Sequence, residues 1–269
     1  MNIFAVYRQR LAALVSGGTI ALALALGAAA LDTHGAELLP ALAPDPAVLS
    51  DYDLVKVPGV RTQMVLLRFS NAIANTGAGE LRIVAYRDSA SPATVDINHD
   101  TMPAFQRIRR ADGTYSDTPA GQLSYHPEHH HFHFDGAARY RLIDSKSQAV
   151  VRESPKISFC LADVAIANPT LPGFRNDPLY NACVHDPYAT FAEMGISIGW
   201  EDIYEKSLIG QALDVTELMN LPPKIYILES TTNPDGILRE SNPAPVSARV
   251  PVRVGLGVPL KVGKSRPGV

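Results

Sequence analysis

The feature that most constrains the fold of this chain is a succession of short apolar segments, several of them alternating between apolar and polar residues, with turn signals between them. Period-two alternation is typical of β-strands, and clusters of Pro, Gly, Asn and Asp are typical of turns. The 21 prolines and 19 glycines leave few uninterrupted stretches for helices. The predicted strands are residues 63–69, 81–86, 137–143, 149–153, 157–161, 212–215, 224–230 and 246–254. This spacing predicts a mainly β fold, an antiparallel β-sandwich with long loops in a single domain.

The segments between the predicted strands indicate where turns and loops lie. The first two predicted strands flank an Asn75-Thr76-Gly77 turn, so we expect them to be neighbours. Residues 88–122 are polar and are predicted to be irregular, with a tight turn at Asp112-Gly113. Residues 168–188 contain several prolines and predict a long loop, and a loop of that length within a compact domain is usually functional.

The overall charge excludes one class of partner. The formal net charge is -3, with 46% hydrophobic and 19% charged residues. This balance is that of an ordinary globular protein and lacks the basic surface expected of a protein that binds nucleic acid or an anionic membrane.

The N-terminus has the pattern of a secretory signal. Arg8 and Arg10 precede an uncharged, Ala- and Leu-rich stretch over residues 11–30, and small residues follow at Ala28–Ala30 and at Gly35-Ala36. We therefore expect an exported protein, periplasmic or extracellular, with no stable membrane association after cleavage. An uncleaved membrane anchor is the alternative. The expected division of the chain is a signal peptide at 1–36, an extended lead-in at 37–60, the domain at 61–255 and a flexible tail at 256–269.

A histidine-rich run at residues 126–135 is the strongest functional signal. It holds five of the eight histidines of the chain. His129, His131 and His133 follow a two-residue step, which in an extended strand places three imidazoles on one face. Imidazole is a common metal ligand, so we predict a metal site. A straight strand would separate His129 from His133 by roughly 13 Å. Either the chain bends near Pro127 or one of the three is not a ligand, and a solvated histidine tract is the alternative.

Two cysteines, Cys160 and Cys183, are the only ones in the chain. In an exported protein such a pair is expected to form a disulfide, whereas two buried thiols are the alternative.

Several segments, in one order, resemble the catalytic domain of the lysyl oxidase family, the copper-dependent protein-lysine oxidases. The resemblance spans roughly residues 65–254, most of the expected mature chain. The segments that carry it are residues 65–69, Asn75-x-Gly77, His129-x-His-x-His133, Tyr140-x-Leu142, Lys156-x-Ser-Phe-Cys-Leu161, Ala182-Cys183, residues 195–204, Gln211-x-x-Asp-Val-Thr216, residues 226–228, Asn233-Pro234 and Glu240-Ser241.

The resemblance implies roles for individual residues. The three histidines at 129, 131 and 133 would hold copper. Lys156 and Tyr204 occupy the positions whose crosslinking makes the family's quinone cofactor, lysine tyrosylquinone, and both are of the required residue type. Without the resemblance, the default expectation is that Lys156 is a solvated lysine and that Tyr204 is a tyrosine of the core. His126 is either a fourth ligand, a residue that orients a ligand, or a surface histidine. His185 lies in the long predicted loop and could approach the site, although a role in the loop alone is favoured.

The resemblance also implies a reaction. The quinone would react with a substrate primary amine, and a general base would remove a proton from the α-carbon. Hydrolysis would release an aldehyde, and O2 would reoxidise the cofactor with release of hydrogen peroxide and ammonia. Asp202 and Asp163 lie near the matched positions and are candidates for the base.

The chain departs from the animal enzymes of the family in its cysteines. Those enzymes have a cysteine immediately before the first copper histidine, where this chain has Glu128. Further cysteines are also absent, so one disulfide at most remains. This short, cysteine-poor form resembles a prokaryotic member of the family.

The sequence therefore favours an exported copper amine oxidase that acts on primary amines, peptidyl lysine among them. Two rival hypotheses remain. One is a copper- or zinc-binding module that never builds the quinone. The other is a zinc hydrolase, because three histidines with an open position also suit a metal-bound water. The presence of both cofactor precursors, Lys156 and Tyr204, ranks the oxidase first.

Overall fold

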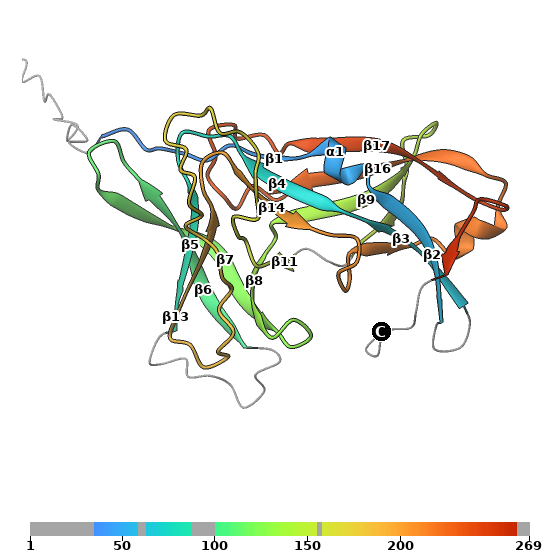
Figure 1. Ribbon diagram of the computed structural model, residues 1–269, viewed down its shortest axis with the longest axis horizontal. Coiled ribbons are helices and arrows are strands. Elements are labelled where there is room, and N and C mark those ends of the chain that lie inside the picture. The colour runs from blue at the N-terminus through green and yellow to red at the C-terminus, as the bar shows by residue number, and fades with distance from the viewer. Residues whose placement is uncertain (1–34, 59–62, 88–99, 155–157, 263–269) are drawn as a thin grey trace, which may run out of the picture. The chain divides into compact units, whose positions relative to one another are not determined.

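The computed structural model describes residues 35–58, 63–87, 100–154 and 158–262 (Figure 1). Within them the fold is mainly β, arranged in four sheets whose strands pair antiparallel except for β18 with β2. The elements are β1 (Leu42–Pro44), α1 (Pro46–Leu49), β2 (Tyr52–Pro58), β3 (Gln63–Phe69), β4 (Asn71–Asn75), β5 (Leu81–Tyr86), β6 (Thr101–Arg109), β7 (Tyr115–His126), β8 (His131–Asp135), β9 (Ala138–Asp144), β10 (Val150–Glu153), β11 (Ser158–Phe159), β12 (Ala165–Ile166), β13 (Phe191–Ile196), β14 (Trp200–Tyr204), β15 (Ala212–Asp214), η2 (Glu217–Asn220), β16 (Lys224–Thr232), β17 (Ser247–Val254) and β18 (Lys261–Val262). The prediction of a mainly antiparallel β protein is confirmed.

The largest sheet has the strand order β11-β8-β7-β6-β5-β13 and lies toward the left of Figure 1, where β5, β6, β7, β8 and β13 are labelled. Its two edges meet, because the Gly195 N–H in β13 donates to the Leu161 carbonyl just after β11, at 3.1 Å. Gly195 is required at this closure, since a Cβ there would lie 2.1 Å from the Leu81 carbonyl oxygen. This hydrogen bond joins one edge strand to the chain just after the other, so the sheet is curled.

The remaining sheets have the orders β10-β9-β16-β17, β1-β4-β14-β12 and β15-β3-β2-β18. Their inward residues and those of the six-stranded sheet form one continuous hydrophobic core. Its largest fully buried side chains include Tyr140, Tyr226, Phe69, Phe132, Phe134 and Phe159. Alternation along β9, with Ala138, Tyr140 and Leu142 buried and the arginines between them half-buried, shows how the period-two pattern becomes a packed face.

Several predicted elements are confirmed at or near their predicted bounds. The strands at Gln63–Phe69 and Leu81–Tyr86 are β3 and β5, and the last predicted strand is β17. The Asp112-Gly113 turn is present, with Gly113 at φ +87°, in the left-handed region that glycine adopts readily. Residues 168–188 contain no helix or strand and form the predicted long loop.

Three predictions about the fold are wrong. The segment at 37–60 is not an extended lead-in, because β1, α1 and β2 lie within it and Leu42 and Leu49 are buried in the core. β3 and β5 do not pair with each other: β4 intervenes, β3 pairs with β2 and β15, and β5 pairs with β6 and β13. The stretch predicted as irregular contains β6 and β7, the latter the longest strand described. In β6 the outward Pro103 and Phe105 and the buried polar Gln106 break the apolar-polar alternation, and in β7 exposed Pro119 and Gly121 interrupt it.

The C-terminal segment is also more ordered than predicted. Lys261 and Val262 form β18, which pairs with β2, so the expected flexible tail is part of a sheet up to that point. Most of the predicted signal peptide, and the last residues of the tail, lie outside the described residues. Among the residues that the structure does describe, no helix is both long and apolar enough to span a bilayer.

Candidate metal centre

The histidine-rich run is a β-hairpin with its turn at residues 127–130. His126 ends β7 and pairs with His131, which begins β8. The His129 N–H donates to the His126 carbonyl at 3.1 Å, and His130 adopts a left-handed backbone conformation with φ 57°. This conformation is uncommon for a residue with a side chain, and here it reverses the direction of the chain. The expected bend is therefore a full turn. The prediction of three histidines along one strand is wrong for His129, which lies in the turn.

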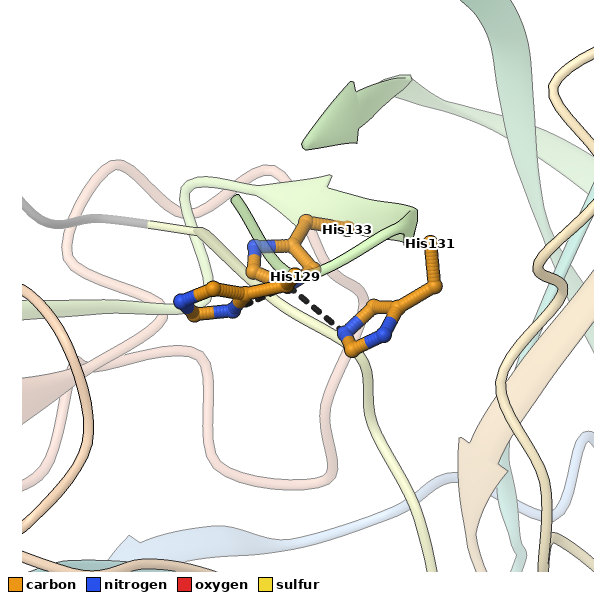
Figure 2. A group of neighbouring side chains, drawn as sticks. All are labelled: His129, His131 and His133. Atoms are coloured by element: carbon orange, nitrogen blue, oxygen red, sulfur yellow. Dashed lines mark hydrogen bonds between the residues drawn. The ribbon is translucent and has the colours of Figure 1, made fainter. Parts of the chain in front are cut away.

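The turn brings the three predicted ligands together (Figure 2). His133 Nε2 lies 2.9 Å from His131 Nε2 and 3.2 Å from His129 Nδ1. One nitrogen of each ring lies within 4.8 Å of one nitrogen of each of the others. On the far side of its ring, His133 Nδ1 lies 3.2 Å from Ser158 Oγ. A hydrogen bond at one ring nitrogen fixes the orientation of an imidazole and aims the other nitrogen at a metal.

The burial of the cluster suits a site with one open side. His133 is only 1% exposed, whereas His129 and His131 are half-buried. The His126 ring stacks on His133, with ring centroids 4.7 Å apart, and lies 4.6 Å from the His129 ring. His126 does not belong to the group of converging nitrogens. Three neutral imidazoles without a carboxylate fit Cu(II) or Zn(II), for which imidazole is a preferred ligand.

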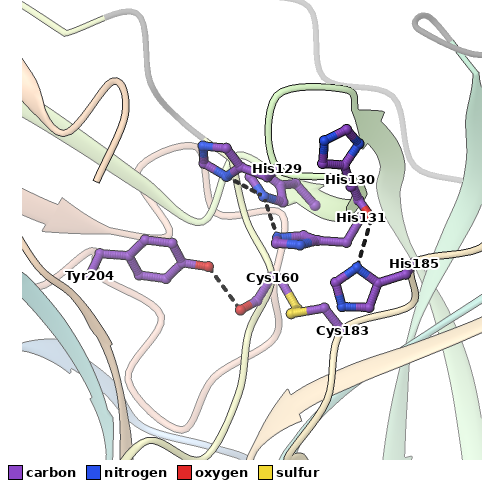
Figure 3. Close-up of a disulfide and its surroundings, with 8 residues drawn as sticks. His129, His130, His131, Cys160, Cys183, His185 and Tyr204 are labelled. Atoms are coloured by element: carbon purple, nitrogen blue, oxygen red, sulfur yellow. Dashed lines mark hydrogen bonds between the residues drawn. A yellow bond between two sulfur atoms is a disulfide. The ribbon is translucent and has the colours of Figure 1, made fainter. Parts of the chain in front are cut away.

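The predicted disulfide is confirmed and lies directly against the histidines (Figure 3). Cys160 and Cys183 are joined with an S–S distance of 2.00 Å and a Cα–Cα distance of 6.0 Å. Both sulfurs lie within 4.8 Å of a ring nitrogen of His131. The disulfide attaches the long loop to the end of β11, and the Phe132 N–H holds the same loop by donating to the Val184 carbonyl at 3.1 Å.

Tyr204 lies on the other side of Cys160 (Figure 3). Its hydroxyl donates to the Cys160 carbonyl at 2.8 Å. Its ring meets the Phe159 ring edge to face, with centroids 4.5 Å apart. Burial raises the pKa of Tyr204 well above its ordinary value, and the neighbouring Asp202 charge raises it further. Cys160 therefore connects Tyr204 to the histidine cluster, because its carbonyl contacts the tyrosine and its sulfur lies near His131.

Lys156 lies outside the described residues, but the chain on either side of it is described. Before it, the Ser154 N–H donates to the Tyr140 carbonyl at 3.0 Å. After it, Ser158 contacts His133, and Phe159 packs on Tyr204. Of the residues described on either side, Ser158 and Phe159 contact the histidine cluster and Tyr204.

The two aspartates predicted as base candidates have different surroundings. The Asp163 carboxylate accepts hydrogen bonds from the backbone N–H groups of Leu179, Tyr180 and Ser197 and from the Ser197 hydroxyl, at 2.7 to 3.2 Å. Asp163 therefore ties the long loop to the end of β13. Asp202 lies two residues before Tyr204 on the same face of β14 and is 2% exposed. Its charge raises the pKa of both Tyr204 and Tyr140.

Three residues near the site were missed by reasoning from the sequence. Tyr140 was expected only as a core residue, yet its hydroxyl lies close enough to Gln211 for that amide to influence its pKa. Both polar atoms of the fully buried Gln211 lack a hydrogen bond of ordinary geometry within the described part of the chain. A role in the loop alone was favoured for His185, but its Nδ1–H donates to the His130 carbonyl at 2.8 Å and its ring meets that of His131, as the alternative allowed. Tyr140 and Gln211 lie in segments that carry the family resemblance, but no role at the site was assigned to either residue, and no local pattern marked His185.

Comparison with known proteins matches the chain to one family. The family description "Lysyl oxidase" matches residues 85–247. Protein-lysine 6-oxidase of Sus scrofa is 27% identical over 215 residues, which cover 76% of this chain and 72% of the pig protein. The proteins of the same name from Rattus norvegicus and Bos taurus are 26% identical over 215 residues. The matched region covers 44% of the rat protein and 43% of the bovine protein, so it spans less than half the length of each.

Proposed function

The chain belongs to the lysyl oxidase family, and on that premise we propose that it is a copper-dependent amine oxidase. The reaction would convert a primary amine, O2 and water to an aldehyde, ammonia and hydrogen peroxide. Substrates would include the side chain of peptidyl lysine. One arrangement supports this function above all others: Cys160 bridges a cluster of three histidines and a buried tyrosine, with its sulfur beside His131 and its carbonyl on the Tyr204 hydroxyl.

The residues present fit the metal and the cofactor. His129, His131 and His133 would hold copper through converging nitrogens of an all-imidazole set. Lys156 and Tyr204 would be the precursors of lysine tyrosylquinone. That group would supply an electrophilic carbonyl that accepts the electron pair of the amine substrate. Tyr204 is buried between Phe159 and the core, which suits a ring that must react at one defined position.

Protein side chains near Tyr204 would position the reacting atoms and move protons. The Cys160 carbonyl holds the hydroxyl of Tyr204, and the Phe159 edge fixes the plane of its ring. Asp202 lies on the same face of β14 and is shielded from solvent, so it is our candidate for the base that takes the α-proton. We assign Asp163 a structural role instead, because four hydrogen bonds already occupy its two oxygens.

We further propose that the protein works outside the cytoplasm. The disulfide between Cys160 and Cys183 supports this location, since such bonds persist in oxidising compartments. The uncharged stretch at residues 11–30, with arginines before it, supports the same location.

The decisive experiment is to load the protein with Cu(II) in aerated buffer and digest it for mass spectrometry. We expect a covalent peptide pair joining Lys156 to Tyr204, quinone staining, and peroxide formation that depends on added amine. Tyr204→Phe should lose all three signals. The matched control Tyr188→Phe, which changes a tyrosine 62% exposed in the long loop, should retain them.

The same experiment separates the rival functions. Unmodified Lys156 and Tyr204 after copper loading, together with no amine-dependent peroxide, would leave a metal-binding module. Ester or amide hydrolysis by the zinc-loaded protein, lost in His133→Ala, would instead identify a zinc hydrolase.

A further inference from the structure

A second group of metal-ligand atoms shares one residue with the histidine cluster. A ring nitrogen of His131 and the sulfurs of Cys160 and Cys183 all lie within 4.8 Å of one another. In the structure the two sulfurs are bonded to each other, and a disulfide sulfur is not a metal ligand of thiolate strength. His131 therefore belongs to two sets of possible ligands, the imidazole set of His129, His131 and His133 and the sulfur set of His131, Cys160 and Cys183, and these sets differ in the redox state that they need. The imidazole set is complete in the oxidised protein, and the sulfur set becomes complete only after reduction.

The backbone around the sulfur set suits chelation. The Cα atoms of Cys160 and Cys183 are 6.0 Å apart, so breaking the S–S bond leaves both sulfurs able to approach one ion of about 2.3 Å bond length without a large movement of the chain. Each cysteine is also held by neighbours. Tyr204 donates to the Cys160 carbonyl, and Phe132 donates to the carbonyl of Val184, the residue after Cys183. These contacts do not depend on the disulfide and keep the two side chains facing each other.

We propose that the reduced form of this protein binds Cu(I) between Cys160, Cys183 and His131. Thiolates are soft ligands and select Cu(I), whereas imidazoles suit Cu(II). The His185 ring lies at the margin of this site, with its centroid 5.3 Å from that of His131. Its Nδ1–H donates to the His130 carbonyl, so its other nitrogen is the one with a lone pair to offer.

The chemistry balances with a thiol or phosphine reductant. With a phosphine, one water supplies the oxygen of the phosphine oxide and the two protons that convert the cysteine sulfurs to thiols. With a thiol, two reductant molecules form their own disulfide and pass their two protons to the cysteine sulfurs. Binding of Cu(I) then displaces the thiol protons, and the oxidation state of copper does not change. Because both sets use His131, one ion cannot occupy both sets fully. Reduction of the cysteine pair thus adds a Cu(I) site on sulfur that competes with the histidine set for His131.

The test is a Cu(I) competition titration on the metal-free protein, reduced with a phosphine and kept without oxygen. Bicinchoninate serves as the coloured competitor. We expect the reduced protein to withdraw one equivalent of Cu(I) at least about 100-fold more tightly than the disulfide form. We also expect Cu(I) to raise the unfolding midpoint of the reduced protein by at least about 3 °C, because the ion closes the same loop as the disulfide.

Variants separate the two sets of ligands. Cys183→Ser should lose the Cu(I) binding of the reduced state and keep Cu(II) binding on the histidines. The matched variant His133→Ala should do the reverse, since His133 belongs only to the imidazole set. His131→Ala should weaken both. Alkylation of the reduced wild-type protein with iodoacetamide blocks the same sulfurs without a substitution, in case Cys183→Ser does not fold.

Two outcomes would overturn the proposal. One is reduced protein that binds Cu(I) no more tightly than the disulfide form. The other is Cu(I) binding that survives both Cys183→Ser and alkylation. Neither measurement involves the quinone or amine turnover, so the oxidase function can fail while this site stands, and the reverse also holds.

Discussion

The clearest test of how the site is built is the replacement of Asp163, the carboxylate that we assign to structure and not to chemistry. In Asp163→Asn, one side-chain oxygen can still accept from the Ser197 N–H. The new amide group, however, must face the N–H groups of Leu179 and Tyr180, which both donate to Oδ2 in the wild-type protein. The Ser197 hydroxyl loses its acceptor on the same oxygen.

The expected cost follows from the number of donors left without an acceptor. Asp163 is 8% exposed, so water has limited access to replace the lost bonds. Two to three hydrogen bonds to a charged group at about 1.5 to 2 kcal/mol each give a loss of about 3 to 6 kcal/mol in the free energy of unfolding. Domains are stable by only about 5 to 15 kcal/mol, so the variant should be marginal but foldable at low temperature.

The assay is urea denaturation followed by tryptophan fluorescence, with Asp177→Asn as the control. Asp177 lies in the same loop and is exposed, so its replacement should change stability by less than about 0.5 kcal/mol. Below its lowered midpoint, Asp163→Asn should still form the crosslink and produce peroxide. A variant that lost peroxide production at unchanged stability would refute the reasoning and return Asp163 to the list of catalytic bases.

Three further predictions concern Asp202, the buried tyrosines and the metal. Asp202→Asn, normalised to its quinone content, should lower kcat for amine oxidation at least about 100-fold with little change in KM, and equal kcat values would exclude it as the base. Burial and the Asp202 charge raise the pKa of the unmodified Tyr204 above the ordinary value of 10.0. The contribution of this pKa shift to stability is complete below about pH 10 and is lost as the pH rises through the folded-state pKa. In the metal-free protein, the urea midpoint should therefore fall less steeply between about pH 8 and 10.5 in Tyr204→Phe than in the wild type. Cu(II) at 100 times its Kd should raise the free energy of unfolding by about 2.7 kcal/mol, as measured by calorimetry. A chelator should reverse this gain, and His133→Ala should not show it.

The sequence predicted those strands whose residues form a clear local pattern, and it missed those whose pattern is interrupted. β3 and β5 are short, mostly apolar runs and β17 alternates strictly, so all three were located closely. β6 and β7 were missed because apolar or turn-forming residues on their outer face, such as Phe105 and Pro119, and the buried polar Gln106 break the apolar-polar alternation. The pairing of β3 with β5 was wrong because proximity along the chain is a weak guide once a strand such as β4 can intervene.

In the candidate site, too, the sequence predicted what local patterns encode and missed the contacts between distant residues. The two-residue spacing of the histidines predicted a metal site, and the pair of cysteines predicted a disulfide. Neither pattern revealed that His129 reaches the others through a turn at His130. The hydrogen bond from Tyr204 to Cys160 joins residues 44 positions apart, and no local pattern encodes such a contact.

The sequence by itself determined which residue types are available, which of them face inward, and, through ordered motifs, the family to which the chain belongs. Side-chain alternation and turn chemistry are local properties, so they can be read without knowing the rest of the fold. Only the tertiary structure decided that His131 is shared between an imidazole set and a sulfur set. It also decided that Asp163 is fully bonded while Asp202 lies beside Tyr204. These facts depend on which distant strands pack together, and that choice is made by the whole core and not by any single segment.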